Sequence, residues 1–386
     1  MPRLQGRAAY VALLAIGGLD AAGYSVIAPV VPAISEETGA GPWVIGLLVS
    51  FFAIGQALGY PLAGHGVQRR NAAWVLGLAL ACMAVGDLGF VLGEGLWVYF
   101  PARLLQGIGA GGLWLGVVFG VLERFPGEEY RRLTGVLGAY SIGAVAGPAL
   151  GAIGGIRGPF LAHLALVCLA ALLVWGLGAP KEQPAFGSDR SALRTPGFRL
   201  ASAAIILVAL SLGTLEGPLP LHFDDLLSQS RIGLLYLATS VMVGLSATLA
   251  GRLLPRRALA LGVCCLVSGI ALAGITDTVP WWLAASAVVG IGLGAGEAGS
   301  IGILLESVGT GRIVLAMVVW SQLWAFGYLV GPAVAGALAD TLGFGAVGIV
   351  PLGAALVVAI AFFHAPAARP ASAQSAAGSS TRRSRR

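Results

Sequence analysis

Residues 135–155 read Gly-Val-Leu-Gly-Ala-Tyr-Ser-Ile-Gly-Ala-Val-Ala-Gly-Pro-Ala-Leu-Gly-Ala-Ile-Gly-Gly. A Gly or Ala recurs at every fourth position of this stretch, and a helix places such positions near one face. A face of small residues lets a second helix approach closely, as helices in membranes do. Pro148 removes one backbone donor and favours a bend. The stretch predicts a membrane helix with a smooth ridge, although ordinary tight packing also explains the ridge. The ridge positions are Gly135, Ala139, Gly143, Gly147, Gly151 and Gly155.

The composition of the whole chain agrees with a membrane protein. Only 40 of the 386 residues are charged, 23 Lys and Arg plus 17 Asp and Glu, whereas soluble chains carry about a quarter. Hydrophobic residues make up 57% and the mean hydropathy is +0.88. These values argue against a soluble multidomain enzyme, a disordered chain and a nucleic-acid partner. The four cysteines lack metal-ligand spacing, so we expect no disulfide framework, metal site or cofactor.

Twelve apolar runs can be placed, each near the length of about 20 residues that a helix needs to cross a bilayer. They lie at approximately 8–34, 42–64, 71–93, 97–121, 133–156, 159–178, 200–221, 232–251, 257–276, 280–304, 313–338 and 344–364. In hydrocarbon every backbone polar group must be satisfied within the segment, so the runs should be helical. The first run follows two arginines as a signal peptide does, but its length and central Asp20 argue against cleavage. The prediction is an all-α integral membrane protein.

Basic residues gather in the links on one side of the predicted bundle. If both termini lie on that side, it holds twenty basic residues, and the opposite side holds only Arg157 and Arg231. Basic links mark the cytoplasmic side. We therefore expect a multi-pass protein of the inner or plasma membrane with both termini cytoplasmic. The net charge of +6 then reports topology.

The polar stretch 179–198 follows six runs and predicts a cytoplasmic linker between two six-helix halves, residues 1–178 and 199–364. Residues 365–386 are rich in Ala, Ser and Arg and predict a disordered basic cytoplasmic tail. Its final arginines could contact anionic lipid, and a plain solvated tail is the alternative.

The two halves repeat each other. Leu-Ala-Gly followed by two arginines occurs at 62–70 and again at 249–257. Gly-Ile-Gly recurs at 107–109 and 290–292, and the step Gly147-Pro148 recurs as Gly331-Pro332. Three matches in the same order predict pseudo-symmetric six-helix halves, with a substrate site near the midplane between them.

These features resemble the major facilitator superfamily, and within it the twelve-span drug and metabolite exporters. The run Gly143-x3-Gly147-Pro148-x2-Gly151 is similar to the family's antiporter motif, with Ala152 in the place of a second Gly. We take these residues as a conformational motif, together with their counterparts in the second half. The counterparts are Gly327, Gly331 and Pro332.

The fourth run carries a second resemblance. Arg103-x-x-Gln106-Gly107-x-Gly109 is similar to the family's Arg-x-x-Gln-Gly-x-Gly motif. In related antiporters this Arg is tied to proton coupling, and the resemblance implies that role for Arg103. A structural or snorkelling Arg is the alternative.

The loop after the second run departs from the family's pattern Gly-x-Leu-Ala-Asp-Arg-x-Gly-Arg-Arg. Arg69 and Arg70 close the loop as the pattern requires, but Gly64 stands in the place of the Asp. The resemblance implies that this Asp helps to latch the cytoplasmic side, so its absence leaves the latch in doubt.

Charged residues inside the runs are the first candidates for mechanism, since burial of an unpaired charge costs several kcal/mol. Asp20 is near the middle of its run and is our candidate for a proton-coupling carboxylate beside Arg103. A static Asp20–Arg103 pair is the alternative. Asp87 lies nearer the outer end of its run, where we expect it to reach water, and we expect His163 at the interface.

Polar and aromatic residues in the runs are candidates for binding substrate. Glu297 follows a glycine-rich stretch and could contact a cationic substrate. Glu216 could bind a cation or proton at the mouth of the site, and a solvated Glu at the interface is the alternative. Two tryptophans one turn apart could line an aromatic cavity, although packing against core or lipid is the commoner role of such residues. The substrate-binding candidates are Tyr24, Gln106, Trp114, Tyr140, Glu216, Glu297, Trp320 and Trp324.

The sequence therefore predicts a secondary-active transporter, not an enzyme. Its partners would be a small organic molecule, protons and the lipid bilayer. The resemblance implies export by proton antiport with alternating access, and a monomer. An uptake symporter or facilitator for a nutrient is the first alternative, and a non-transporting receptor is the second.

Overall fold

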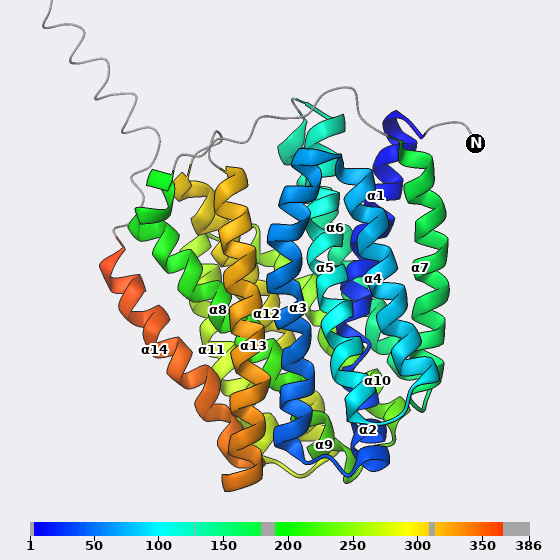
Figure 1. The fold of residues 1–386 in the computed structure, drawn as a ribbon. Coiled ribbons are helices and arrows are strands. Elements are labelled where there is room, and N and C mark those ends of the chain that lie inside the picture. Colours follow the sequence, from blue (N-terminus) through cyan, green and yellow to red (C-terminus); the bar gives the residue numbers. More distant parts are fainter. Residues whose placement is uncertain (1–3, 127, 179–189, 309–312, 366–386) are drawn as a thin grey trace, which may run out of the picture.

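A computed structural model describes residues 4–126, 128–178, 190–308 and 313–365, and this part of the chain is helical without strands (Figure 1). Short 3₁₀ helices occur at Ala28–Val30, Arg190–Arg194 and Phe344–Gly348. The α-helices are α1 (Gly6–Ser25), α2 (Val31–Thr38), α3 (Pro42–Arg69), α4 (Ala72–Leu92), α5 (Leu96–Arg124), α6 (Glu129–Gly151), α7 (Arg157–Leu177), α8 (Pro196–Glu216), α9 (Leu219–Asp224), α10 (Gln229–Ala250), α11 (Pro255–Ile275), α12 (Val279–Val308), α13 (Ile313–Leu342) and α14 (Ile349–His364).

The long helices confirm the predicted membrane architecture. Among the described residues, eleven segments are long and apolar enough to cross a membrane, counting α1 with α2 and α8 with α9 as one segment each. The remaining long helix, α6, lies in the same bundle and packs against α1 and α10. It is less apolar because Gly and Ala fill much of it and its first turn is charged.

Proline interrupts two of the predicted runs near one end of the bundle. The first run is not one helix, because α1 ends at Ser25 and α2 begins at Val31, with Pro29 and Pro32 in this region. In the same way, α8 ends at Glu216, just before two further prolines. Proline has no N–H to donate and therefore favours a break. The breaks lie at the end of the bundle away from the chain's N-terminus, which we call the opposite end (Figure 1).

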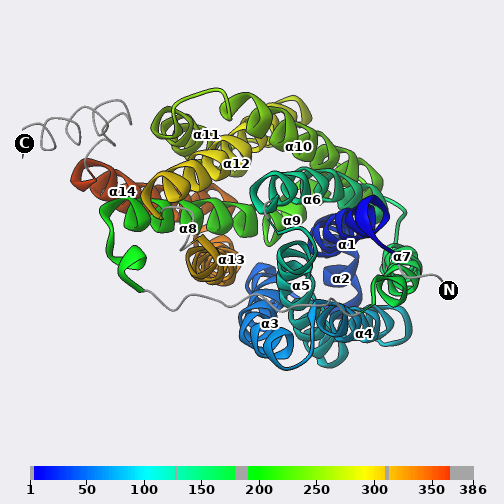
Figure 2. The ribbon, with the colours of Figure 1, turned by 90° about the horizontal axis from the view of Figure 1, so that it is seen from above.

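The helices form two groups of six that repeat each other's packing (Figure 2). The N-terminal group contains α1 and α3–α7, and the C-terminal group contains α8 and α10–α14; each has its own apolar core. In the first group, a Cβ on Gly143 of α6 would overlap the backbone carbonyl of Gly18 in α1. In the second, a Cβ on Gly331 of α13 would overlap the carbonyl of Leu210 in α8. The predicted internal repeat is thus confirmed as pseudo-symmetry.

Most of the contact between the groups comes from two helix pairs, α3 with α13 and α6 with α10. They are pseudo-symmetric as well, since the carbonyl of Pro332 lies against Gly46 and that of Pro148 lies against Gly233. At the opposite end the contacts become polar. The Asp340 carboxylate accepts a hydrogen bond of 2.9 Å from the backbone N–H of Trp43 at the start of α3.

The second pair of helices is also pinned at the opposite end. The Gln229 amide, in the first turn of α10, donates to the carbonyls of Gly151 and Gly155 at 3.0 and 2.9 Å. The hydroxyl of Ser230 donates to the carbonyl of Ala152 at 2.9 Å. The two groups are therefore tied together at this end by hydrogen bonds as well as by close backbone packing.

The predicted domain boundaries stay a prediction. Most of the linker, residues 179–189, lies outside the described residues, and its last part forms the 3₁₀ helix Arg190–Arg194 and the start of α8. The predicted tail lies outside the described residues from 366 onward.

Candidate functional site

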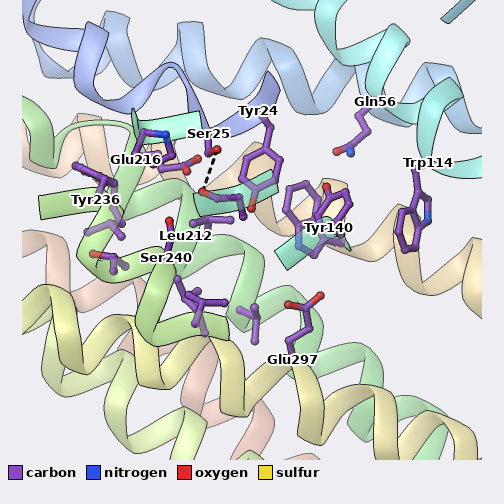
Figure 3. A pocket seen from close by; sticks show the side chains of 18 of the residues that line it. Tyr24, Ser25, Gln56, Trp114, Tyr140, Leu212, Glu216, Tyr236, Ser240 and Glu297 are labelled. Atoms are coloured by element: carbon purple, nitrogen blue, oxygen red, sulfur yellow. Dashed lines mark hydrogen bonds between the residues drawn. The ribbon is translucent and has the colours of Figure 1, made fainter. Parts of the chain in front are cut away.

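A cavity lies between the two helix groups and draws its walls from both (Figure 3). Its volume is about 90 Å³, enough for several water molecules. Its lining residues come from α1, α3, α5 and α6 on one side and from α8, α10, α12 and α13 on the other. A site shared by two pseudo-symmetric halves is where transporter folds of this kind bind substrate.

Aromatic rings form much of the wall. Tyr24 of α1 stacks on Tyr140 of α6 with ring centroids 6.0 Å apart, and Trp114 of α5 meets Tyr140 edge-on at 5.4 Å. Across the cavity, Trp324 of α13 approaches Tyr24 edge-on at 6.0 Å. The Trp114 indole also donates to the hydroxyl of Ser321 on α13 at 3.1 Å. The aromatic wall thus connects the two groups.

Two carboxylates from the C-terminal group line the same cavity. Glu297 lies on α12, points toward the side of the cavity that holds Tyr140 (Figure 3), and has no hydrogen-bond partner among the described residues. Glu216 at the end of α8 is only 3% exposed and accepts a hydrogen bond of 2.5 Å from the Tyr328 hydroxyl. The prediction that Glu216 binds substrate stays open, but its carboxylate is not solvated at an interface.

Asp20 is buried one helical turn before Tyr24 on α1 and is 1% exposed. Neither carboxylate oxygen has a hydrogen-bond partner in the described structure. An ionised carboxylate in such a position carries a large desolvation cost. Asp20 does not line the cavity, but it lies one helical turn before Tyr24, which does.

Arg103 is fully buried in α5, and its guanidinium belongs to a hydrogen-bond network. Its guanidinium donates to the Gln106 side-chain oxygen at 3.0 Å and to the Tyr24 backbone carbonyl at 3.2 Å. It also lies 4.3 Å from the centre of the Phe52 ring, a cation–π contact. The static Asp20–Arg103 ion pair considered as an alternative is not present, because Arg103 uses these other partners.

Two residues that we expected near water belong to this network. Asp87 of α4 and His163 of α7 are both 0% exposed, and the prediction that they reach water or the interface is wrong. Asp87 accepts from the Gln106 amide at 2.8 Å, and its other oxygen lies 2.8 Å from Nδ1 of His163. The residues lie deep because α4 packs on both α5 and α7.

The glycines of the conformational motif lie at helix contacts. Like Gly143, two further glycines of α6 face backbone carbonyls: Gly147 faces that of Ala22 in α1, and Gly151 faces that of Val26 just after α1. In the second group, Gly327 lies against the carbonyl of Ile206 in α8. The small side chains thus permit close approach to the first helix of each group, and their part in conformational change stays a prediction.

The loop motif lies apart from the cavity. Arg69 and Arg70 are exposed at the end of α3, and a side chain added at Gly64 would meet nothing within 4 Å. Gly64 stands where the family's pattern has an Asp, and a side chain at this position would face open space in this conformation.

Most substrate-binding candidates share the cavity, but their roles stay predictions. All of them line it except Gln106, which bonds to Arg103 and Asp87 instead. Three further residues line the cavity and are not among the predicted ones: Tyr60, Tyr236 and Ser321. A polar group inside an apolar run was the only available signal for them.

The fold and the cavity define a multi-pass membrane protein built of two pseudo-symmetric six-helix groups around a central site. The sequence profile of the Major Facilitator Superfamily matches residues 13–226 and 197–385. The chain belongs to the Major Facilitator Superfamily.

Two relatives that match part of the chain are named for drug resistance. The chain is 35% identical over 176 residues to the class G tetracycline resistance protein of Vibrio anguillarum, covering 43% of this chain and 44% of that protein. It is 28% identical over 167 residues to multidrug resistance protein 1 of Bacillus subtilis (strain 168), covering 42% and 43%. The matches thus span less than half the length of these relatives.

The fold also matches a solved structure over nearly its whole length. A bacterial homologue of the human lysosomal transporter Spinster, in an inward-facing and occupied conformation, superposes with a TM-score of 0.73 at 16% identity. The match covers 92% of this chain and 94% of that one. At this identity the likeness concerns the fold alone.

Proposed function

We propose that this protein is a secondary-active transporter that exports a small organic compound by proton antiport and alternating access. The observation that carries the proposal is the cavity between the two helix groups, because a site shared by both groups can open to either side as they rock. Relatives named for tetracycline and multidrug resistance support export over uptake.

The preferred substrate is an organic cation with an aromatic part. The Glu297 carboxylate faces the cavity without a protein partner, so a cationic ligand could neutralise it. Rings such as Tyr24, Tyr140 and Trp324 could hold a cation over their faces or stack on an aromatic group.

Asp20 is the proposed proton carrier and Arg103 its coupling partner. The Asp20 carboxyl is buried without a partner, so taking up a proton removes the cost of a buried charge. Because Asp20 lies one helical turn before Tyr24 in the cavity wall, a bound cation favours its ionised form. Cation binding and proton binding would therefore oppose each other, as antiport requires.

In the cell we propose that the protein is a monomer in the inner or plasma membrane, with both termini cytoplasmic. Arg124 near the end of α5 and Arg132 in the first turns of α6 lie at the same end of the bundle as residue 4. This agrees with the positive-inside rule.

The test uses purified protein in liposomes with an imposed pH gradient, ethidium as an aromatic cation and fluorescein as an aromatic anion. Gradient-driven ethidium movement with protons moving the opposite way is expected, and fluorescein should not move. Asp20→Asn should abolish the driven movement, whereas Glu94→Gln, at an exposed ion pair with Arg157, should leave it intact.

Each other outcome selects a different function. Ethidium and protons moving in the same direction would indicate a symporter. Ethidium movement without protons would indicate a facilitator. Binding without movement would indicate a receptor. Undiminished antiport by Asp20→Asn would remove Asp20 from the mechanism.

A further inference from the structure

Behind Arg103 lies a continuous chain of buried hydrogen bonds that reaches three neighbouring helices. It runs from Arg103 to Gln106 in α5, then to Asp87 in α4 and on to His163 in α7, with distances of 3.0, 2.8 and 2.8 Å. All four side chains are 0% exposed. Ionisable groups at such a depth are expensive unless each is paired, so the chain needs an explanation beyond packing.

The chemistry of the groups fixes the direction of the chain. Arg103 can only donate, so the Gln106 oxygen must face it and the Gln106 amide must face away. That amide donates to one oxygen of Asp87, and an ionised carboxylate can only accept, so His163 donates its Nδ1 proton to the other oxygen. Gln106 thus links the Asp87 carboxyl to Arg103 through two hydrogen bonds, and His163 holds Asp87 in the orientation that allows this.

The far end of the hydrogen-bond chain lies close to α1. His163 lies against Gly23 of α1, where an added Cβ would come within 2.9 Å of Nε2. The next residue, Tyr24, gives its backbone carbonyl to Arg103. Both ends of the chain therefore contact α1 at adjacent residues, one turn after Asp20.

On its other side Arg103 faces the C-terminal group. The Phe52 ring that Arg103 contacts meets Tyr328 of α13 edge-on at 6.2 Å, and the Tyr328 hydroxyl donates to Glu216. Arg103 is thus placed between one carboxylate of its own group, Asp87, and one of the other group, Glu216. The strength of the hydrogen-bonded link from Arg103 through Gln106 to Asp87 therefore decides how firmly the guanidinium stays within the N-terminal group.

We propose that Asp87 and His163 are positioning residues that anchor Arg103 and so keep the Asp20 carboxyl unpaired. This inference rests on the proposed proton antiport. Without the anchor, Arg103 can turn from the Tyr24 carbonyl toward Asp20, which lies one helical turn earlier on α1 and whose carboxyl has no partner among the described residues. An Asp20 paired with Arg103 no longer exchanges its proton with the substrate cycle. Substrate can still move downhill, but the proton gradient no longer drives it.

The test compares His163→Leu with His163→Asn in liposomes. The Asn amide stands at the same distance along the side chain as His Nδ1 and can still donate to Asp87, whereas Leu cannot. Two rates are measured with ethidium: exchange without a gradient, and accumulation driven by a pH gradient. His222→Leu is the matched control, because His222 is also buried but bonds to the Thr276 carbonyl, away from the network.

His163→Leu should keep the wild-type rate of exchange, whereas the accumulation driven by the pH gradient should fall by about tenfold. A tenfold effect is within the usual range of coupling between two binding sites. His163→Asn and His222→Leu should keep the wild-type ratio of the two rates. Asp87→Asn, which keeps the shape of the side chain but removes the charge, should behave as His163→Leu does, and it decides the matter if the Leu variant does not fold.

A loss of both rates in equal proportion, or equal behaviour of the Leu and Asn variants, would overturn the inference and leave a packing role. Unchanged accumulation by Asp87→Asn would overturn it too. A wild-type protein without proton-driven accumulation would instead reject the proposed function, so the two failures are separate.

Discussion

The hydrogen bond between Tyr328 and Glu216 is among the most deeply buried in the protein. A carboxylate that loses its donor in such a place is left with an unmet desolvation cost of about 1–3 kcal/mol or more. We therefore expect Tyr328→Phe to lower the thermal unfolding temperature in detergent. Tyr99→Phe is the matched control, because Tyr99 donates to Glu37, whose side chain is exposed and can turn to water. An equal loss in both variants would show that burial of the acceptor does not matter.

Glu297 offers a prediction about affinity. If its carboxylate neutralises a cationic substrate, Glu297→Gln should raise the Kd for ethidium by about thirtyfold, the lower end of the cost of removing one partner of a buried charge pair. Glu306→Gln is the control, since Glu306 lies on the same helix but is exposed. Isothermal titration of the detergent-solubilised protein measures both. Unchanged affinity in Glu297→Gln would place the cation elsewhere.

At the residue scale, the sequence could locate charges along the helices but not the directions in which they face. Asp20, Arg103 and Glu297 stood out because each interrupts an apolar run. Asp87 and His163 were misjudged because an apolar helix looks alike on every face, so position along it was the only guide to water. Their burial depends on α4 lying against both α5 and α7, and α7 is distant from α4 in the chain.

At the element scale, the ridge of α6 can be tested with one substitution at two positions. A Cβ at Gly143 would overlap the backbone carbonyl of Gly18, so Gly143→Ala should destabilise the protein by about 1–3 kcal/mol. On the same helix, Gly138 is exposed and meets nothing within 4 Å. Gly138→Ala should therefore be neutral or stabilise by up to about 1 kcal/mol. Thermal unfolding in detergent measures both, and equal effects would mean that α6 and α1 can separate freely.

The predicted runs matched the long helices because the bilayer sets their length, and the fourfold spacing of glycines predicted a close contact. Which helix fills that contact could not be predicted, because many helices could pack on a smooth ridge. The break after α1 follows from Pro29 and Pro32, but the short helix that continues to Thr38 depends on tertiary packing near α9.

For the whole molecule, the repeated sequence motifs predicted two pseudo-symmetric halves. The structure shows that the contacts between the two helix groups follow the same pseudo-symmetry. The α3–α13 and α6–α10 pairs are equivalent, and both carry a proline carbonyl against a glycine of the other group. The polar ties of Asp340 and Gln229 lie at the opposite end. Alternating access would require these ties to break when that end opens, so they set part of the balance between conformations.

Asp340 is the tie that can be removed with least disturbance, because its carboxylate accepts only from the N–H at the start of α3 and is exposed. A carboxylate at a helix N-terminus is worth about 0.5–2 kcal/mol. Asp340→Ala should therefore shift the equilibrium several-fold toward conformations open at this end. Spin labels at Ile153→Cys and Leu226→Cys, in a chain whose native cysteines are replaced, report the separation of the groups. Asp277→Ala is the control, because Asp277 is exposed at the same end but contacts only His222 of its own group. A distance distribution that is the same in both variants would mean that close packing alone holds this end shut.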